Sequence, residues 1–282
     1  MAEIKEVTQN DLYAARIFFN SALPLVKVIV QDVPKIGKKF VGKNFIFQVS
    51  ARYDKAEKGK MATYFDVKNG EFTVHVSEVC DKPDIEFIFP DLHKFILFFS
   101  GRGMPLPKMT GIMQHFGVFL SLMQALLKMA GLLQAKDAPA NEADQQLLVK
   151  LYFYLLANGI SQLNKAGQEK IHTWALESPD RAYAFAVNGH DDLASYIRVF
   201  TGNSRAGHGA YPRCKPFLTL RFDTPMHALD ILMGKGDMIE YIASCFLTVE
   251  GAPEFASIVG EFMFVVGDYA KGLYLDWPES AT

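Results

Sequence analysis

Hydrophobic and polar positions follow the same order twice along this chain. Residues 82–89 read Lys-Pro-Asp-Ile-Glu-Phe-Ile-Phe, and an apolar segment joins them to Gly101-Arg102-Gly103. Residues 215–222 read Lys-Pro-Phe-Leu-Thr-Leu-Arg-Phe, and an apolar segment of equal length joins them to Gly234-Lys235-Gly236, an offset of 133 residues. Solenoid repeats are only about 20–50 residues long, so the pattern predicts two related modules instead.

A second set of matches occurs at a shorter offset. Tyr64 and the turn Asn69-Gly70 correspond to Tyr183 and Asn188-Gly189, 119 residues later. We assign the difference between the two offsets to the segment 201–214, which is rich in Gly, Arg and Ser. Such a composition is typical of a connector, and the segment is interpreted as a loop inserted in the second copy.

Periodicity predicts the elements of the first half. Apolar residues at helical spacing indicate a helix from Leu12 to Leu25, and alternation over 45–49 is typical of a half-buried strand. Asn-Gly accepts positive φ, so residues 62–67 and 72–76 are predicted to form a hairpin. The remaining predicted elements are a strand at 85–89, a helix at 93–99 after Asp91, and a long apolar helix at 112–133.

The second half repeats this order after a linker at 134–144. A dense apolar helix is predicted at 146–160 and another at 253–274. The predicted strands are 171–174, 183–187, 193–200, 217–222 and 246–251, with Pro225 in the first turn of a helix after the fourth strand. The first half has no clear counterpart of strand 246–251, because Pro105 and Pro107 interrupt the matching stretch.

Strands joined by hairpins and followed by helices predict an α+β fold made of two tandem modules. We assign residues 1–138 to the first module and residues 139–282 to the second. Each module is expected to hold a mostly antiparallel sheet, packed with helices around an apolar core or cavity.

Composition narrows the function classes. Of the 282 residues 50% are hydrophobic, and the formal net charge is −2. A nucleic-acid-binding surface needs a clustered basic face, so we expect no nucleic-acid partner. The three cysteines show neither a disulfide framework nor zinc-finger spacing. With no signal segment and no apolar run of the ~20 residues that a membrane span requires, a cytoplasmic location is expected.

Signals of catalysis are few. The seven histidines show no metal-ligand spacing, and no GxSxG motif occurs. We therefore predict no catalytic residue, no metal and no cofactor. The Gly-rich stretch 202–209 lacks the Lys-Ser/Thr end of a phosphate loop. Arg205, His208 and Arg213 are nevertheless candidates to meet an anionic head group at the mouth of a pocket.

The short motifs together resemble the sterol carrier protein type 2-like lipid-binding family. The resemblance is carried in the first half by Asn69-Gly70, 83–89, Asp91 and Gly101, and in the second by Asn188-Gly189, 216–222, Gly234 and 246–251. It implies a five-stranded sheet packed with helices around an apolar tunnel for sterols, fatty acids or acyl-CoA. The tandem arrangement and Phe217, which stands where the family has Asp, depart from the usual single module.

The implied function is non-catalytic binding or carriage of a fatty acid, acyl-CoA or sterol-like lipid. Each buried methylene contributes about 0.8 kcal/mol, so a long chain binds without a specific motif. We expect the second half to do the work, because it keeps strand 246–251. The candidate wall residues are Phe95, Phe98, Phe99, Met113, Phe116, Leu120 and Met123 in the first half, and Leu229, Leu232, Met233, Phe255, Val259, Phe262 and Phe264 in the second.

Two other functions remain open. In an interaction or sensor module with a vestigial cavity, Phe side chains would fill the space that a ligand needs. In an enzyme acting on an apolar substrate, a histidine and a carboxylate would face a cavity. A transient membrane contact and a homodimer also remain open as partners.

Overall fold

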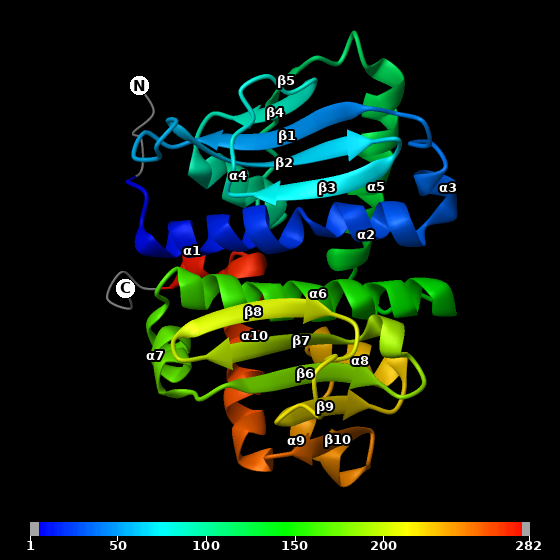
Figure 1. Ribbon diagram of the computed structural model, residues 1–282, viewed down its shortest axis with the longest axis vertical. Helices are drawn as coiled ribbons and strands as arrows, with labels where there is room; N and C mark the ends of the chain where they lie inside the picture. Colours follow the sequence, from blue (N-terminus) through cyan, green and yellow to red (C-terminus); the bar gives the residue numbers. More distant parts are fainter. Residues whose placement is uncertain (1–5, 278–282) are drawn as a thin grey trace. The chain divides into compact units, whose positions relative to one another are not determined.

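The computed structural model describes residues 6–277 and shows a mixed α+β protein with two five-stranded sheets (Figure 1). The first sheet has the order β3-β2-β1-β4-β5, and the second, taken from the matching edge, has the order β8-β7-β6-β9-β10. In each sheet the central strand pairs parallel with one neighbour, and every other pairing is antiparallel. The two sheets share one topology, which confirms the predicted fold class.

The hairpin predicted at Asn69-Gly70 forms as expected. Both residues have positive φ, 52° and 83°, and they connect two strands whose last ladder pair is Lys68 and Glu71. The strands of the first sheet are β1 Phe45–Arg52, β2 Lys60–Lys68, β3 Glu71–Val76, β4 Ile85–Phe89 and β5 Lys108–Thr110. Those of the second are β6 Arg181–Val187, β7 Ser195–Phe200, β8 Asn203–His208, β9 Leu218–Phe222 and β10 Leu247–Gly251.

Helices cover one face of each sheet. In Figure 1, α4 and α5 lie behind the first sheet, and α8 and α10 lie behind the second. Before the linker the helices are α1 Gln9–Ile17, the π-helical η1 Phe18–Ala22, α2 Leu25–Asp32, α3 Pro34–Gly37, α4 Leu92–Phe99 and α5 Phe116–Leu133. After the linker they are α6 Glu142–Lys165, α7 Glu169–Glu177, η2 Asp191–Leu193, α8 Pro225–Leu232, α9 Met238–Ala243, η3 Pro253–Phe255, α10 Ala256–Ala270 and η4 Leu273–Asp276.

The division into modules differs from the boundary expected at residue 138. Residues up to Ala130 form one compact unit together with those from Asp268 on, and Gly131–Gly267 form the other. The end of the chain belongs to the first unit because its tyrosines bind α1: Tyr269 Oη donates to Asn10 Oδ1 at 2.7 Å, and Tyr274 Oη donates to Asp11 Oδ1 at 2.8 Å. Nothing in the strand pattern predicted this return.

Two elements of the second module correct the sequence-based assignment. Residues 171–174, expected as a strand, lie in α7, where the Gln168 side chain caps the helix by accepting from the Ile171 N–H. Residues 203–208, expected within an inserted loop, form β8, which pairs antiparallel with β7. The polar composition of β8 hides a strand because β8 lies at the edge of its sheet, where most of its side chains are at least partly exposed.

These corrections also change the internal alignment. β6 takes the place of β1, so Asn188-Gly189 follows the first strand of its sheet, whereas Asn69-Gly70 follows the second. The matches at an offset of 119 residues therefore equated two turns that occupy different positions in their sheets. β4 and β9, matched at the offset of 133 residues, occupy equivalent positions in the two sheets. The fifth strand expected to be missing from the first half exists as the three-residue β5. Pro105 and Pro107 limit it, since proline has no N–H to donate to a ladder.

Two helical stretches within residues 6–277 are long and apolar enough to cross a membrane by length and composition alone. They are Gln9–Asp32 and Phe116–Leu133, and the expectation that no segment reaches this length was wrong for both. In the first, 78% of the apolar window is buried inside the protein, as in a core helix. In the second only 28% is buried, so α5 presents apolar surface to solvent.

Candidate functional site

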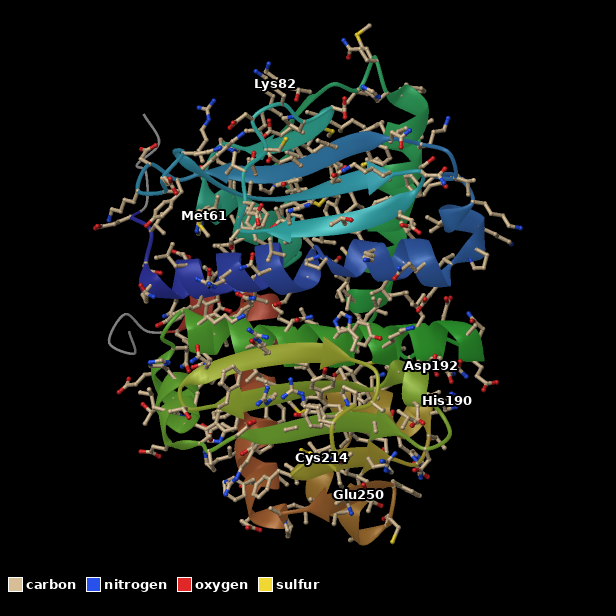
Figure 2. The ribbon with its side chains drawn as sticks, in the orientation of Figure 1. Met61, Lys82, His190, Asp192, Cys214 and Glu250 are labelled. Atoms are coloured by element: carbon tan, nitrogen blue, oxygen red, sulfur yellow. The ribbon has the colours of Figure 1, made fainter. Side chains whose placement is uncertain are left out.

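A cleft of about 470 Å³ opens in the second module where the start of β6, the end of β7 and the loop before β9 meet. Cys214, labelled in Figure 2, lies in that loop between Arg213 and Lys215. The lining residues are Asp180, Arg181, Ala182, Arg198, Tyr211, Arg213, Cys214, Lys215 and Phe217.

Strand alternation and one glycine position the loop at the cleft. Ile197 and Val199 of β7 are buried, so Tyr196 and Arg198 point to the opposite sheet face. Tyr196 lies across Gly207, where an added Cβ would come within 2.1 Å of the tyrosine ring. The ring of Tyr211 packs edge-on against Tyr196, with centroids 4.8 Å apart. This contact holds the loop that carries Arg213 and Lys215 against the sheet.

The cleft carries an excess of positive charge. Its one carboxylate, Asp180, is held by Arg198, whose Nε lies 2.7 Å from Oδ1 and whose Nη2 contacts Oδ2. The hydrogen bond from Arg198 lowers the pKa of Asp180, and Arg213 adds a smaller effect in the same direction. No carboxylate within residues 6–277 forms an ion pair with Arg181, Arg213 or Lys215. The cleft is therefore suited to an anion.

Aromatic rings form the apolar side of the cleft. The guanidinium of Arg181 lies over Phe217, 3.9 Å from the ring centroid, and 5.0 Å from the centroid of Phe255. Phe217 and Phe255 pack edge to face at 5.1 Å. The N–H of Phe217 donates to the Ala182 carbonyl at 2.8 Å and fixes the loop end beside β6. An anionic group at Arg181 would thus have apolar surface next to it.

The ring contacts continue from the cleft into the core. Tyr183 packs against Phe217 at 5.8 Å and against Trp174 at 5.1 Å, and Trp174 packs against Phe262 at 5.0 Å. These residues come from four different elements: β6, α7, α10 and the loop before β9. They connect the charged opening with the helices that cover the sheet.

Two buried polar atoms in this row of rings make no hydrogen bond within the described chain. They are Tyr183 Oη and Trp174 Nε1, although more than nine in ten buried polar groups are normally paired. Burial raises the pKa of the Tyr183 phenol, and the nearby Arg181, Ser178 and Trp174 oppose this effect without forming a hydrogen bond to the hydroxyl. A polar ligand atom placed here would give both groups a partner.

The three predicted head-group residues do not lie together. Arg213 lines the cleft. Arg205 lies on β8 directly opposite Arg198 and is exposed, so it adds positive charge beside the cleft. His208 pairs with Ser195 of β7, which lies three residues from Arg198. At about 3.3 Å per residue, Ser195 and Arg198 are roughly 10 Å apart along the strand. His208 stacks on Tyr154 at 3.7 Å, with its Nε2 3.3 Å from Asn158 Nδ2, and is excluded from the site.

The predicted wall of the second module splits between core and surface. Phe255 lies beside Arg181, and Phe262 is buried against Trp174. Leu229 and Val259 are buried, and Leu232 and Met233 are half-buried. None of these four residues lines the cleft. Phe264 is 62% exposed, which corrects its assignment to an internal wall.

The predicted wall of the first module splits in the same way. Phe95 stacks on Phe19 with ring centroids 4.0 Å apart. Phe99 packs against Phe95 and Phe89, and Phe98 packs against Phe89 and Phe99. Phenyl rings thus fill the space between α4, η1 and β4. Met113, Phe116 and Leu120 are exposed and Met123 is half-buried, so these four do not share a cavity wall with the three phenylalanines of α4.

Sequence reasoning missed most of the cleft. Arg181, Arg198 and Lys215 were not predicted, nor were Trp174 and Tyr183. The alternation of β7 could have placed Arg198 on the helix-free face. The position of Trp174 was hidden because its segment was interpreted as a strand, whereas it lies in α7.

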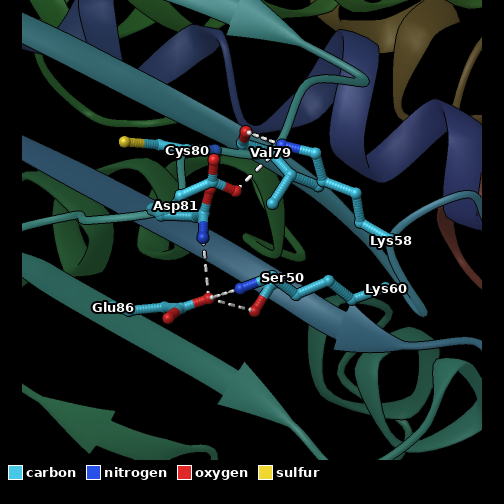
Figure 3. Close-up of polar contacts among 8 residues, drawn as sticks. Ser50, Lys58, Lys60, Val79, Cys80, Asp81 and Glu86 are labelled. Carbon is cyan, nitrogen blue, oxygen red and sulfur yellow. Dashed lines mark hydrogen bonds and ion pairs between the residues drawn. The ribbon is translucent and has the colours of Figure 1, made fainter.

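The first module holds a polar cluster of a different kind on the helix-free face of its sheet (Figure 3). Glu86, on β4, is 7% exposed, and its Oε1 accepts from Gln48 Nε2 and Ser50 Oγ, both at 2.7 Å, and from Lys60 Nζ at 2.8 Å. Burial alone would raise the pKa of Glu86, but the three donors, Lys60 foremost, lower it below the usual value. A fully compensated carboxylate is a structural group.

The second module has no copy of this cluster. Thr219 takes the place of Glu86, and Ala184 and Ala186 take those of Gln48 and Ser50. Elsewhere, His227 Nδ1 lies 2.6 Å from Asp223 Oδ1 under the ring of Phe246. No group of three or more His, Cys, Asp or Glu side chains within residues 6–277 is arranged to hold a metal ion.

Neither a protein-family model nor a curated protein matches the chain. Solved structures align with parts of it at low similarity. A conserved hypothetical protein of Thermus thermophilus, described as a candidate sterol carrier protein, is 15% identical with a TM-score of 0.25, over 46% of this chain and 90% of that one. The stereoselective inverting sec-alkylsulfatase Pisa1 from Pseudomonas sp. is 12% identical with a TM-score of 0.25, over 54% of this chain and 29% of the sulfatase. The site is therefore interpreted from its own residues.

Proposed function

We propose that this protein binds and carries an apolar molecule with an anionic head, a fatty acid or an acyl-CoA, through its second module. The observation that carries the proposal is the set of cations without carboxylate partners at the cleft, Arg181, Arg213 and Lys215, beside the rings of Phe217 and Phe255. A carboxylate or phosphate would pair with the cations, while the first methylenes of the chain would contact the rings. A cytoplasmic location is part of the same proposal.

The cleft favours an acid over a sterol-like lipid. A sterol presents a neutral hydroxyl, which gains little from three positive charges, whereas an ionised head forms stronger, charge-assisted hydrogen bonds. Tyr183 Oη and Trp174 Nε1 can serve either head, since both are donors without a partner among the described residues. We therefore expect acids to bind most tightly and sterols to bind through the inner donors alone.

The test compares a long-chain fatty acid with the fatty alcohol of equal length by titration calorimetry on delipidated protein. The acid should bind more tightly. Arg181→Gln should weaken the acid roughly tenfold, because hydrogen bonds to charged groups at a half-buried site are strong. Arg213→Gln should weaken it only about threefold, because Arg213 is exposed and screened.

Lys170→Gln is the matched control for these variants. It also removes one positive charge from the second module, but Lys170 is engaged with Glu261 and does not line the cleft. Its acid affinity should equal that of the wild type. Equal affinity of acid and alcohol for the wild-type protein, or equal losses in Arg181→Gln and Lys170→Gln, would contradict an anion site at this cleft.

A different function is favoured for the first module. Its predicted cavity space is occupied by the rings of Phe19, Phe89, Phe95 and Phe99, with centroids 4.0 to 6.0 Å apart in the contacts among them. A cavity filled in this way has no room for a lipid, so we propose that the first module is an interaction module on the same scaffold. Binding of one ligand per chain, rather than two, is the expected stoichiometry.

A further inference from the structure

The first module presents a stripe of large apolar side chains to solvent. It comprises Met104, Leu106, Met113, Phe116, Leu120 and Leu127, which are 48% to 91% exposed. The last four follow helical spacing along α5 and the turn before it, so they lie on one side, and Met104 and Leu106 lie in the preceding loop. Large exposed apolar side chains gathered on one side of a helix mark a contact with another body rather than with water.

The charge of Asp, Glu, Lys and Arg within the segment that carries the stripe is of one sign. Residues 92–130 contain Lys94, Arg102, Lys108 and Lys128 but no Asp or Glu. Lys94 and Arg102 are engaged with Asp91 and Asp276 from outside this segment. Lys108 is exposed between Leu106 and Met113 and forms no ion pair within residues 6–277. The segment that carries the stripe thus supplies cationic groups only, and the carboxylate beside it is Asp84 of the loop before β4, whose Oδ1 lies 3.6 Å from His115 Nε2.

We propose that this stripe docks on the surface of an anionic lipid bilayer. Apolar side chains of an interfacial helix enter the boundary between headgroups and acyl chains, and nearby lysines gain from the negative surface potential. A second copy of the chain fits the stripe less well. A two-fold contact through the same surface would place Lys108 and its segment against an identical cationic segment, and such like-charge contacts are unfavourable.

The proposal is independent of the ligand cleft, because none of its residues belongs to the second module. It predicts that the full chain sediments with vesicles of phosphatidylcholine mixed with phosphatidylserine, and less with phosphatidylcholine alone. Raising the salt concentration should weaken the binding, because the Debye length shortens from about 10 Å at 0.1 M to about 3 Å at 1 M.

Phe116→Asp is the decisive variant and Phe264→Asp its matched control. The two phenylalanines are 58% and 62% exposed on α5 and on α10 respectively, so both variants should fold. Around Phe264 in the sequence lie Glu254, Glu261, Asp268 and Lys271, so the net charge there is negative and does not suit an anionic surface. Phe116→Asp should reduce partitioning into the mixed vesicles roughly tenfold or more, since it removes a large apolar side chain and adds a negative charge, and Phe264→Asp should leave it unchanged.

A second variant, at an exposed lysine, keeps the proposal testable if Phe116→Asp fails to fold. Lys108→Gln keeps every apolar residue, and it should reduce the preference for phosphatidylserine by roughly threefold to fivefold. Equal vesicle binding by Phe116→Asp and wild type would overturn the proposal. So would a wild-type protein that ignores vesicles but forms a dimer that Phe116→Asp abolishes, because the stripe would then be the interface between two copies.

Discussion

The guanidinium of Arg181 lies over the phenyl ring of Phe217, with 3.9 Å between Cζ and the ring centroid. A guanidinium stacked on a ring keeps its in-plane N–H donors available. The neighbouring Asp180 does not neutralise this group, because it is engaged with Arg198. Arg181 is thus oriented by an aromatic contact and can bind an anion without first releasing a protein carboxylate.

Replacing Phe217 with leucine should weaken anion binding while leaving the charge of the cleft intact. The lost cation–π contact amounts to about 0.5–1 kcal/mol at a partly exposed site, which is a twofold to fivefold loss in fatty-acid affinity by calorimetry. Phe246→Leu, which changes a ring stacked on His227 instead, should bind like wild type. A Phe217→Leu protein with undiminished affinity would show that the ring does not orient Arg181.

Removing the unpaired hydroxyl of Tyr183 should have opposite effects on the empty and the occupied protein. Tyr183→Phe deletes a buried polar group without a partner among the described residues, so the ligand-free protein should gain about 1 kcal/mol in its free energy of unfolding. The same variant should bind the ligand head less tightly. Denaturant unfolding and calorimetry measure the two quantities. A Tyr183→Phe protein that is less stable would mean that the hydroxyl already has a partner.

The buried carboxylate of Glu86 should make the first module acid-sensitive. Its folded-state pKa lies below that of an unfolded glutamate, about 4.3. Its stabilising contribution is therefore complete above the unfolded pKa and is lost as the pH falls through the folded value. Unfolding free energies measured from pH 7 downward should decline less in Glu86→Gln than in wild type. An unchanged pH slope would remove Glu86 from the acid response.

Lys60→Met tests the same cluster at neutral pH. It leaves the Glu86 carboxylate with Ser50 and Gln48 as donors but without a compensating charge. The expected loss is about 2 kcal/mol in the free energy of unfolding, and the pKa of Glu86 should rise toward its usual range. The double variant Lys60→Met with Glu86→Gln should recover part of the loss, because no buried charge is left unpaired.

The hydroxyl of Tyr274 should be important for the first module although it lies near the end of the chain. It donates to Asp11 at 2.8 Å, and both residues are about 5% exposed or less. Burial, with Asp11 nearby, raises the pKa of Tyr274, so the phenol stays protonated and donating. Tyr274→Phe should lower the free energy of unfolding by about 2 kcal/mol, measured by denaturant titration. Tyr53→Phe, a substitution of a tyrosine outside this contact, is the control.

The sequence predicted the fold where local signals agree with long-range packing. β4 and β9, each the parallel partner of a central strand, carry an apolar residue at every second position, and Asn69-Gly70 has the positive φ that its composition favours. It failed at β8, because an edge strand needs no apolar face, and at α7, because four residues in isolation fit a strand or a helix equally well.

The site was harder to predict because it depends on register. Arg213 was recognised as a basic residue in a polar loop, but Arg181 and Arg198 meet it only through the pairing of β6 with β7. The apolar content of a helix also did not show whether other elements of the protein bury its apolar side chains. Phe95 and Phe116 have the same side chain, yet one is fully buried and the other is mostly exposed, because only one of them faces the sheet.

The return of the chain end to α1 has a consequence for biosynthesis. Asp11 and Tyr274 are 263 positions apart, so the ribosome must translate the whole second module before this contact can form. The module made first is therefore the one completed last. While the nascent chain lengthens, Asn10 and Asp11 wait without their tyrosine partners, and the second module reaches its full set of contacts earlier. Tandem domains usually complete folding in the order in which they are synthesised, the N-terminal domain first. Here the first module makes its last contacts after the second module has been synthesised.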